Sequence, residues 1–263
     1  MWNIGVCAPF NDYKRMTALK EAGADFFEFS FSALGNATDE QFKESLAFVK
    51  ELGLPVVSMN GLLVGDFRMT GDNTNHDVIA EFVEKTLERA VQYGTRNFVI
   101  GSGKARSVPE GFPEEKAREQ LESLFVDKLL PIFAKYDSYL SIEELRKEEC
   151  NIFVTCRETM ETIRKINHPN LTLLVDYYHA MLGGDTFEEI ASYKGKITHV
   201  HIASPLHERH VPMPGDGEDY QGFFDALKKA DYKAANISLE GNYGGKDVAE
   251  TAKTSIAYLK TFN

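Results

Sequence analysis

Short runs of apolar residues alternate along the chain with longer segments in which apolar residues recur about every 3.6 positions. The short runs have the length of β-strands, and the longer segments have the period of amphipathic helices. Eight strands are predicted, at residues 2–8, 25–31, 55–60, 98–100, 139–142, 171–175, 197–202 and 236–239. The predicted helices are 13–21, 39–52, 76–93, 114–136, 155–166, 186–192, 220–230 and 247–259.

Three local signals mark helix boundaries. Thr38 and Gln41 match a capping box at the start of helix 39–52. Gly94 is placed to end helix 76–93. Pro131 is expected to kink or interrupt helix 114–136, because proline cannot donate the backbone hydrogen bond.

Strand–helix alternation of this kind predicts a parallel sheet, and eight units are the number in a (β/α)₈ TIM barrel. The runs 98–100 and 171–175 are almost wholly apolar, as in strands covered on both faces. The alternative is a doubly wound open sheet, but no G-x-G-x-x-G follows the first strand. We expect one α/β domain over residues 1–263.

Charge and cysteine content narrow the class of protein. Lys and Arg total 29 and Asp and Glu total 40, so the formal net charge is −11, which disfavours a nucleic-acid partner. The three cysteines are an odd number without a C-x-x-C pattern, so no disulfide framework is expected. No apolar run approaches 18 residues, and residues 1–7 read as a strand rather than a signal peptide. We expect a cytoplasmic protein without a membrane partner.

A polar side chain lies at the carboxyl end of each of four consecutive predicted strands. These are Glu143, Asp176, His201 and Glu240, on strands five to eight. In a TIM barrel the carboxyl ends of the strands carry the chemistry, so these side chains are expected to meet there. Three carboxylates would repel one another without a cation. Together with an imidazole they predict a site for one divalent ion, Mn²⁺, Co²⁺ or Mg²⁺, with Zn²⁺ as an alternative.

Other polar residues near strand ends are secondary candidates. His199 and His201 flank Val200, and only one of the two imidazoles is expected to face the barrel axis. The loop after the fourth strand contains Gly101, Gly103 and Arg106, and Arg106 is a candidate for binding a sugar hydroxyl or a phosphate. Asn60 ends the third strand and is a further candidate contact to substrate.

Four segments together resemble motifs of the xylose-isomerase-like TIM-barrel superfamily, and within it the ketose 3-epimerase type of sugar isomerase and epimerase. Residues 142–151, IEELRKEECN, are similar to E-x-L-N-R-x-E-x-N, and residues 174–179, LVDYYH, are similar to L-D-x-x-H. Residues 198–201, THVH, resemble G-H-x-H, and residues 209–217, RHVPMPGDG, resemble R-x-V-P-G-x-G.

The resemblance implies a divalent-metal-dependent sugar isomerase or epimerase. Such an enzyme removes a proton from the carbon next to a ketose carbonyl, through a metal-stabilised enediolate. The four strand-end residues are then the metal ligands, with Glu143 and Glu240 also acting as the acid/base pair. Glu149, His179 and Arg209 match positions that hold substrate hydroxyls. A small-molecule sugar is the implied partner, and a homo-oligomer is common among resembling proteins.

The chain departs from these motifs at two places, and three other functions stay open. Arg146 stands where the motif has Asn, and the segment between His201 and Arg209 is longer than in the family. A dehydratase or lyase acting on a keto-sugar or inosose would share the first step. An apurinic endonuclease would need His ligands after strands three and four. A non-catalytic sugar-binding barrel would be expected to lack one of the four ligands.

Overall fold

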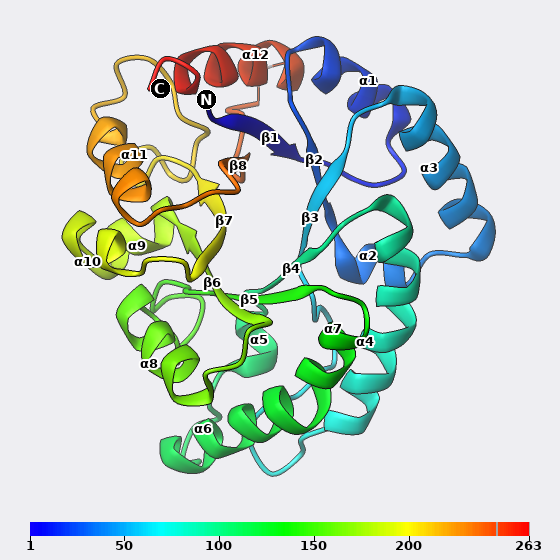
Figure 1. The fold of residues 1–263 in the computed structure, drawn as a ribbon, viewed down its shortest axis with the longest axis vertical. Coiled ribbons are helices and arrows are strands. Elements are labelled where there is room, and N and C mark those ends of the chain that lie inside the picture. The colour runs from blue at the N-terminus through cyan, green and yellow to red at the C-terminus, as the bar shows by residue number, and fades with distance from the viewer. Residues whose placement is uncertain (246, 263) are drawn as a thin grey trace.

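The computed structural model describes residues 1–245 and 247–262, and its centre is a closed barrel of eight parallel strands surrounded by helices (Figure 1). Each strand pairs with its sequence neighbours, and β1 pairs with β8 to close the barrel. The strands are β1 (Asn3–Cys7), β2 (Phe27–Ser30), β3 (Val56–Asn60), β4 (Asn97–Ile100), β5 (Tyr139–Glu143), β6 (Leu171–Asp176), β7 (Ile197–Ile202) and β8 (Asn236–Leu239). The predicted (β/α)₈ TIM barrel is therefore confirmed.

The helices form the outer layer in chain order. They are α1 (Tyr13–Glu21), α2 (Phe31–Gly35), α3 (Asp39–Leu52), α4 (His76–Ala90), α5 (Gly103–Arg106), α6 (Glu114–Ser123), α7 (Leu130–Lys135), α8 (Cys156–Ile166), α9 (Tyr177–Gly183), α10 (Phe187–Ser192), α11 (Tyr220–Lys229) and α12 (Val248–Leu259). The short helices α2, α5 and α9 were not predicted. None of the described helices is long and apolar enough to cross a membrane.

The predicted boundary signals act as expected. Thr38 and Gln41 form both hydrogen bonds of the capping box of α3. Gly94 adopts a left-handed conformation after the 3₁₀ turn η1 (Val91–Tyr93), which continues α4. Pro131 lies in the first turn of α7, and a π-helical segment, η2 (Leu124–Leu129), separates α7 from α6. The proline therefore interrupts the long helix, as its missing N–H predicts.

The barrel seam brings the two ends of the described chain together. The first and last strands pair in register from Asn3 opposite Asn236 to Val6 opposite Leu239. Trp2 Nε1 donates a hydrogen bond of 3.1 Å to the carbonyl of Phe262. The blue strand β1 and the red helix α12 accordingly lie side by side in Figure 1.

Candidate active site

The four predicted strand-end side chains meet at the carboxyl-terminal mouth of the barrel. Glu143, Asp176, His201 and Glu240 each offer one ligand atom, and these atoms all lie within 4.8 Å of one another. Glu143, Asp176 and His201 are buried, and Glu240 is partly exposed. We call these four residues the carboxylate–imidazole group.

Strand register places Asp176 and His201 directly opposite each other, whereas Glu143 and Glu240 are each offset by two residues along their strands. Asp176 on β6 pairs directly with His201 on β7, and Glu143 on β5 pairs with Leu174 on β6. The register of β6 against β7 shifts between Leu173 and Leu174, two residues before Asp176. Irregularities of this kind re-aim side chains at barrel rims and beside active sites.

His201 is the centre of the group. Its Nδ1 lies 3.0 Å from Glu143 Oε1 and 3.3 Å from Glu240 Oε2, and its Nε2 lies 2.9 Å from Glu28 Oε1. Burial alone would lower the pKa of His201, but the carboxylates of Glu28, Glu240 and Glu143 outweigh it and raise that pKa well above the ordinary value. Both ring nitrogens of His201 thus face an acceptor.

Glu28 is a site residue that the sequence analysis did not identify. It is fully buried on β2, and its Oε2 lies 2.7 Å from Nε2 of His199. Burial opposes its ionisation, but His201 and His199 outweigh burial and hold the pKa of Glu28 far below its usual range. A carboxylate between Phe27 and Phe29, in a predicted strand, was the available signal.

Both imidazoles of β7 face the barrel axis, so the expectation that only one would do so was wrong. His199 and His201 both contact the carboxylate of Glu28. The physical reason is that residues two apart on a strand point to the same face. His199 therefore lies below His201 and shares its carboxylate partner.

A column of polar side chains continues from Glu28 down the barrel axis. Ser58 Oγ donates to Glu28 Oε1 at 3.3 Å, and Asn97 Nδ2 donates to Ser58 Oγ at 3.1 Å. Ser141 Oγ donates to Asn97 Oδ1 at 2.6 Å and lies 2.8 Å from Thr198 Oγ1. Because these buried polar groups satisfy one another, they hold Glu28 in one position.

Gly101, directly after β4, makes room for Glu143. A Cβ at position 101 would lie 2.3 Å from Glu143 Oε2, which is closer than any van der Waals contact. The backbone at Gly101 does not require positive φ, so the need for glycine here is steric. The absence of a side chain at Gly101 thus allows the carboxylate of Glu143, on the neighbouring strand, to occupy its position.

The two carboxylates next to Arg209 are in different electrostatic states. Burial opposes ionisation of Glu240, but His201 and Arg209 outweigh it and lower the pKa of Glu240 to about 2. Burial raises the pKa of Asp176 to about 7, opposed by Arg209 and assisted by Glu240 and Glu143. Glu240 is therefore ionised at neutral pH, whereas Asp176 holds a proton more readily than an ordinary aspartate does.

The donor set fits a divalent cation. Oδ2 of Asp176 is buried and accepts no hydrogen bond from any described residue, although it belongs to the group. A buried oxygen without a donor is costly unless a cation or a ligand satisfies it. Oxygen-rich donor sets with one imidazole suit Mn²⁺, Mg²⁺ or Co²⁺.

The predicted hydroxyl-binding residues lie at the rim of this group. Arg209 Nη2 lies 2.5 Å from Glu240 Oε2 and 3.6 Å from Asp176 Oδ2, and its Nη1 lies 3.7 Å from Glu149 Oε1. His179 Nε2 lies 3.6 Å from Asp176 Oδ2 and forms no hydrogen bond with a described residue. The structure thus brings Glu149, His179 and Arg209 together beside the carboxylate–imidazole group.

Arg146, which replaces the Asn of the motif, belongs to the same rim. Its Nε donates to Glu149 Oε1 at 2.8 Å, and its backbone N–H donates to Nδ1 of His179 at 3.2 Å. The guanidinium groups of Arg146 and Arg209 both lie over the ring of Tyr178, at 5.3 Å and 5.2 Å from its centroid. The bond from Arg146 to Nδ1 leaves Nε2 of His179 directed at Asp176.

Asn60 joins the group, whereas Arg106 does not. Asn60 Nδ2 donates to Glu240 Oε1 at 3.2 Å. Arg106 is 1% exposed, and it donates to the carbonyls of Ile100 and Phe153 at 3.0 Å and 3.3 Å. Its guanidinium also lies over the ring of Phe153. These contacts favour a structural role for Arg106 instead of the predicted contact with substrate.

Comparison with known proteins identifies the class. The family described as xylose isomerase-like TIM barrel matches residues 16–262, so the chain belongs to this family. Over 221 residues the chain is 30% identical to a ketose 3-epimerase of Arthrobacter globiformis, covering 81% of this chain and 72% of that protein. Both matches confirm the resemblance found in the motifs.

A second relative and a solved structure agree with this assignment. A 2-oxo-tetronate isomerase of Pectobacterium atrosepticum is 28% identical over 170 residues, which span 62% of this chain and 61% of that isomerase, less than two thirds of its length. The crystal structure of a 3-keto-D-glucoside 4-epimerase from E. coli superposes with a TM-score of 0.84 and 21% identity, over 99% of this chain and 100% of that chain. At that identity the likeness supports the fold alone.

Proposed function

We propose that the protein is a divalent-metal-dependent isomerase or epimerase that transfers a proton at the carbon next to the carbonyl of a ketose. The observation that carries the proposal is the convergence of Glu143, Asp176, His201 and Glu240 within 4.8 Å. The names of the two relatives, an isomerase and a ketose 3-epimerase, support the reaction class. A small sugar is the proposed partner, and a nucleic acid is not expected.

The same four residues would hold the cation, Mn²⁺, Co²⁺ or Mg²⁺, with Zn²⁺ as an alternative. A bound cation would stabilise the negative charge that develops on the carbonyl oxygen when the neighbouring carbon loses its proton. The buried, donor-free Oδ2 of Asp176 supports this assignment.

Glu143 and Glu240 are the proposed acid and base. They come from β5 and from the end of β8, and His201 Nδ1 lies within 3.3 Å of both. Asn60 and Arg209 each bond one oxygen of Glu240, which restrains the carboxylate in one orientation. Because its pKa is lowered, Glu240 is ionised at neutral pH, and a general base must be in this state before it can accept a proton.

The rim residues would position the substrate. Arg209 and His179 offer donors toward the group, and Glu149 offers a carboxylate oxygen beside Arg209. Sugar hydroxyls both donate and accept, so this mixed set can hold a chain of them. Proton return to the opposite face of the same carbon would give epimerisation, and proton return to the adjacent carbon would give isomerisation.

Hydrogen exchange in D₂O tests the proposal directly. The protein is incubated with Mn²⁺ and a panel of ketoses and their phosphates, and the products are read by NMR. Deuterium at C3 identifies an epimerase, and a new aldehyde identifies an aldose–ketose isomerase. A lost hydroxyl identifies the dehydratase alternative, which shares the first step.

Two controls make this test specific. Glu240→Gln keeps the shape of the side chain but removes the base, so exchange should fall at least about a hundredfold. Glu161→Gln changes an exposed carboxylate on α8 and should exchange like the wild type. Removal of divalent ions by EDTA should abolish exchange, and Mn²⁺ should restore it. Full activity of Glu240→Gln, or of the EDTA-treated protein, would contradict the proposal.

A further inference from the structure

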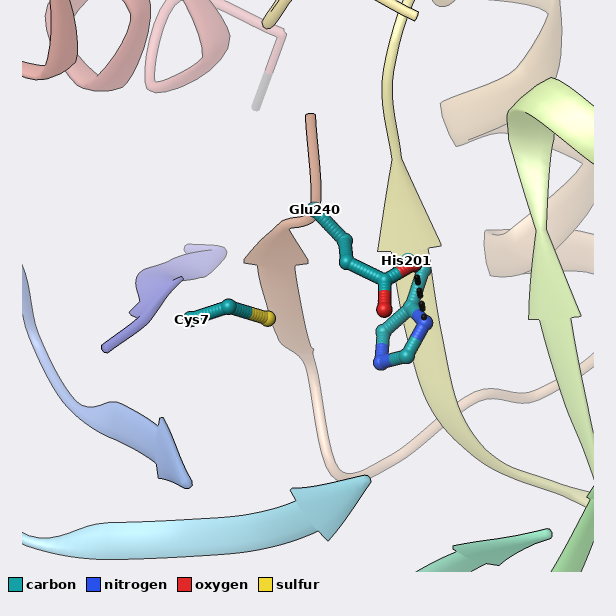
Figure 2. Close-up of side chains that lie close together, drawn as sticks. All are labelled: Cys7, His201 and Glu240. Atoms are coloured by element: carbon teal, nitrogen blue, oxygen red, sulfur yellow. Dashed lines mark ion pairs between the residues drawn. The ribbon is translucent and has the colours of Figure 1, made fainter. Parts of the chain in front are cut away.

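Cys7 lies beside two members of the carboxylate–imidazole group. One ligand atom from each of Cys7, His201 and Glu240 lies within 4.8 Å of the other two. Figure 2 shows the Cys7 side chain extending from β1 toward Glu240 and the ring of His201. Cys7 is partly exposed, whereas the other two cysteines, Cys150 and Cys156, are buried. Cys7 is therefore the least buried of the three cysteines.

Barrel closure fixes this arrangement. In the pairing of β1 with β8, Val6 lies opposite Leu239, so the next residues along the two strands are Cys7 and Glu240. On the other side of β8, His201 on β7 pairs with Ser238. Three adjacent strands thus supply the thiol, the carboxylate and the imidazole, and no loop rearrangement is needed to bring them together.

Asn60 links two of the three side chains. Its Nδ2 lies 3.5 Å from Sγ of Cys7 and 3.2 Å from Oε1 of Glu240. The amide N–H groups are donors, so both partners present a lone pair toward the same point. This contact holds the sulfur and the carboxylate oxygen near each other.

We propose that Cys7, His201 and Glu240 form a second cation position, selective for thiophilic divalent ions such as Zn²⁺ and Cd²⁺. Cysteine sulfur, histidine nitrogen and carboxylate oxygen are each ligands that Zn²⁺ takes in proteins. The carboxylate–imidazole group offers no sulfur, so it lacks this preference. On binding, the S–H bond of Cys7 breaks, a sulfur–metal bond forms, and the proton passes to solvent.

Occupation of this position has a consequence for the proposed reaction. His201 and Glu240 belong to both the Cys7 position and the carboxylate–imidazole group. A thiophilic ion bound at Cys7 would therefore occupy two of the ligands that Mn²⁺ needs. Cd²⁺ is then an inhibitor that competes with Mn²⁺, and Zn²⁺ inhibits when it occupies this position. This consequence rests on the proposed function, whereas metal binding at Cys7 does not.

Charge-transfer spectroscopy tests the position without measuring activity. Cd²⁺ gives an ultraviolet charge-transfer band only when a thiolate binds it. The wild-type protein should show this band at one equivalent of metal, and Cys7→Ser should lose it. Cys150→Ser, at a buried cysteine, is the matched control and should keep it. Cd²⁺ affinity should fall at least about tenfold in Cys7→Ser, and Mn²⁺ affinity should change less than about threefold.

The ¹¹³Cd chemical shift of the wild-type protein gives a second measurement that needs no variant. A shift in the range of mixed sulfur, nitrogen and oxygen ligation supports the position, and a shift for oxygen and nitrogen alone overturns it. Absence of the charge-transfer band in the wild type, or its persistence in Cys7→Ser, would also overturn it. Exchange in D₂O with Mn²⁺ is scored separately, so failure of the proposed function leaves these results interpretable.

Discussion

Oε1 of Glu28 lies 2.9 Å from Nε2 of His201, which leaves Nδ1 of the same ring facing Glu143 and Glu240. This bond assigns one nitrogen to the buried carboxylate and the other to the carboxylate–imidazole group. Carboxylates placed behind a histidine in this way fix the tautomer and the ring orientation of a metal ligand. Glu28 is therefore a positioning residue for the proposed cation site.

The first prediction concerns Glu28→Gln. Loss of the charge behind His201 should lower Mn²⁺ affinity about 10- to 100-fold, measured by calorimetry. Ser58→Ala is the matched control, because it removes another contact to Glu28 without touching His201. A ¹⁵N–¹H spectrum of histidine-labelled protein should show a changed tautomer for His201 in Glu28→Gln alone. Wild-type Mn²⁺ affinity in Glu28→Gln would contradict a positioning role.

The second prediction concerns Gly101→Ala. The new methyl group would lie 2.3 Å from Glu143 Oε2, so the carboxylate must move. Mn²⁺ affinity and exchange activity should both fall at least about tenfold, because a proposed metal ligand and acid/base group is displaced. Gly23→Ala is the contrast, since Gly23 has φ of +97° and open space around it. That variant should lose about 1–2 kcal/mol of stability, seen in urea unfolding, and keep its Mn²⁺ affinity.

Much of this fold was predictable because its signals are local. Helices 13–21 and 39–52 were predicted with the boundaries that the structure has, since capping residues and periodicity agree there. Helix α9 was missed because Asp176, the last residue of β6, is also its N-cap, so no loop separates strand from helix. The apolar run that predicts β6 therefore gave no indication that α9 begins directly after it.

The site was predictable to the extent that polar residues end apolar strands. Glu143, Asp176, His201 and Glu240 follow that rule, and their convergence follows from parallel strands in a closed barrel. The sequence analysis did not identify Glu28 because it lies between two phenylalanines inside a strand. Its burial depends on side chains of other strands, which come close only when the barrel closes. Neither the contact of Glu28 with His201 nor the proximity of Cys7 to Glu240 has a local signature in the sequence.

The third prediction separates the two readings of Arg106. Its charge in a glycine-containing loop indicated a contact with substrate, but the guanidinium is buried against Ile100 and Phe153. Arg106→Met should therefore leave two carbonyls unpaired and cost about 2 kcal/mol of unfolding free energy in urea. The KM for substrate should stay unchanged in the folded variant. Lys104→Met, at an exposed position of α5, should change neither quantity. A raised KM in Arg106→Met would instead support the predicted contact of Arg106 with substrate.

The fourth prediction is a pH dependence set by Glu158. Burial opposes ionisation of this carboxyl, but the N–H groups of Val154 and Phe153 and the Arg118 guanidinium outweigh burial and lower its pKa. A lowered pKa in the folded state stabilises the fold above the unfolded-state pKa of about 4.3, and this stability is lost as the pH falls through the folded-state value.

Glu158→Gln should therefore destabilise the protein by about 1–3 kcal/mol at pH 7, and the difference from wild type should shrink in acid. Urea unfolding at several pH values measures it, with the exposed Glu161→Gln as the control. A difference that is constant with pH would show that the charge of Glu158 contributes nothing.

Because β1 pairs with β8, the proposed cation site can form only after the last strand has been synthesised. Glu240 follows the last strand, so a nascent chain that has released only β1 to β7 carries three of the four proposed ligands and cannot complete the site. Docking of β8 beside β1 adds the fourth ligand and the neighbour of Cys7 in the same event. Binding of the proposed cation and the final closure of the barrel would then be one linked equilibrium, and an ion that binds the closed form would favour the finished fold.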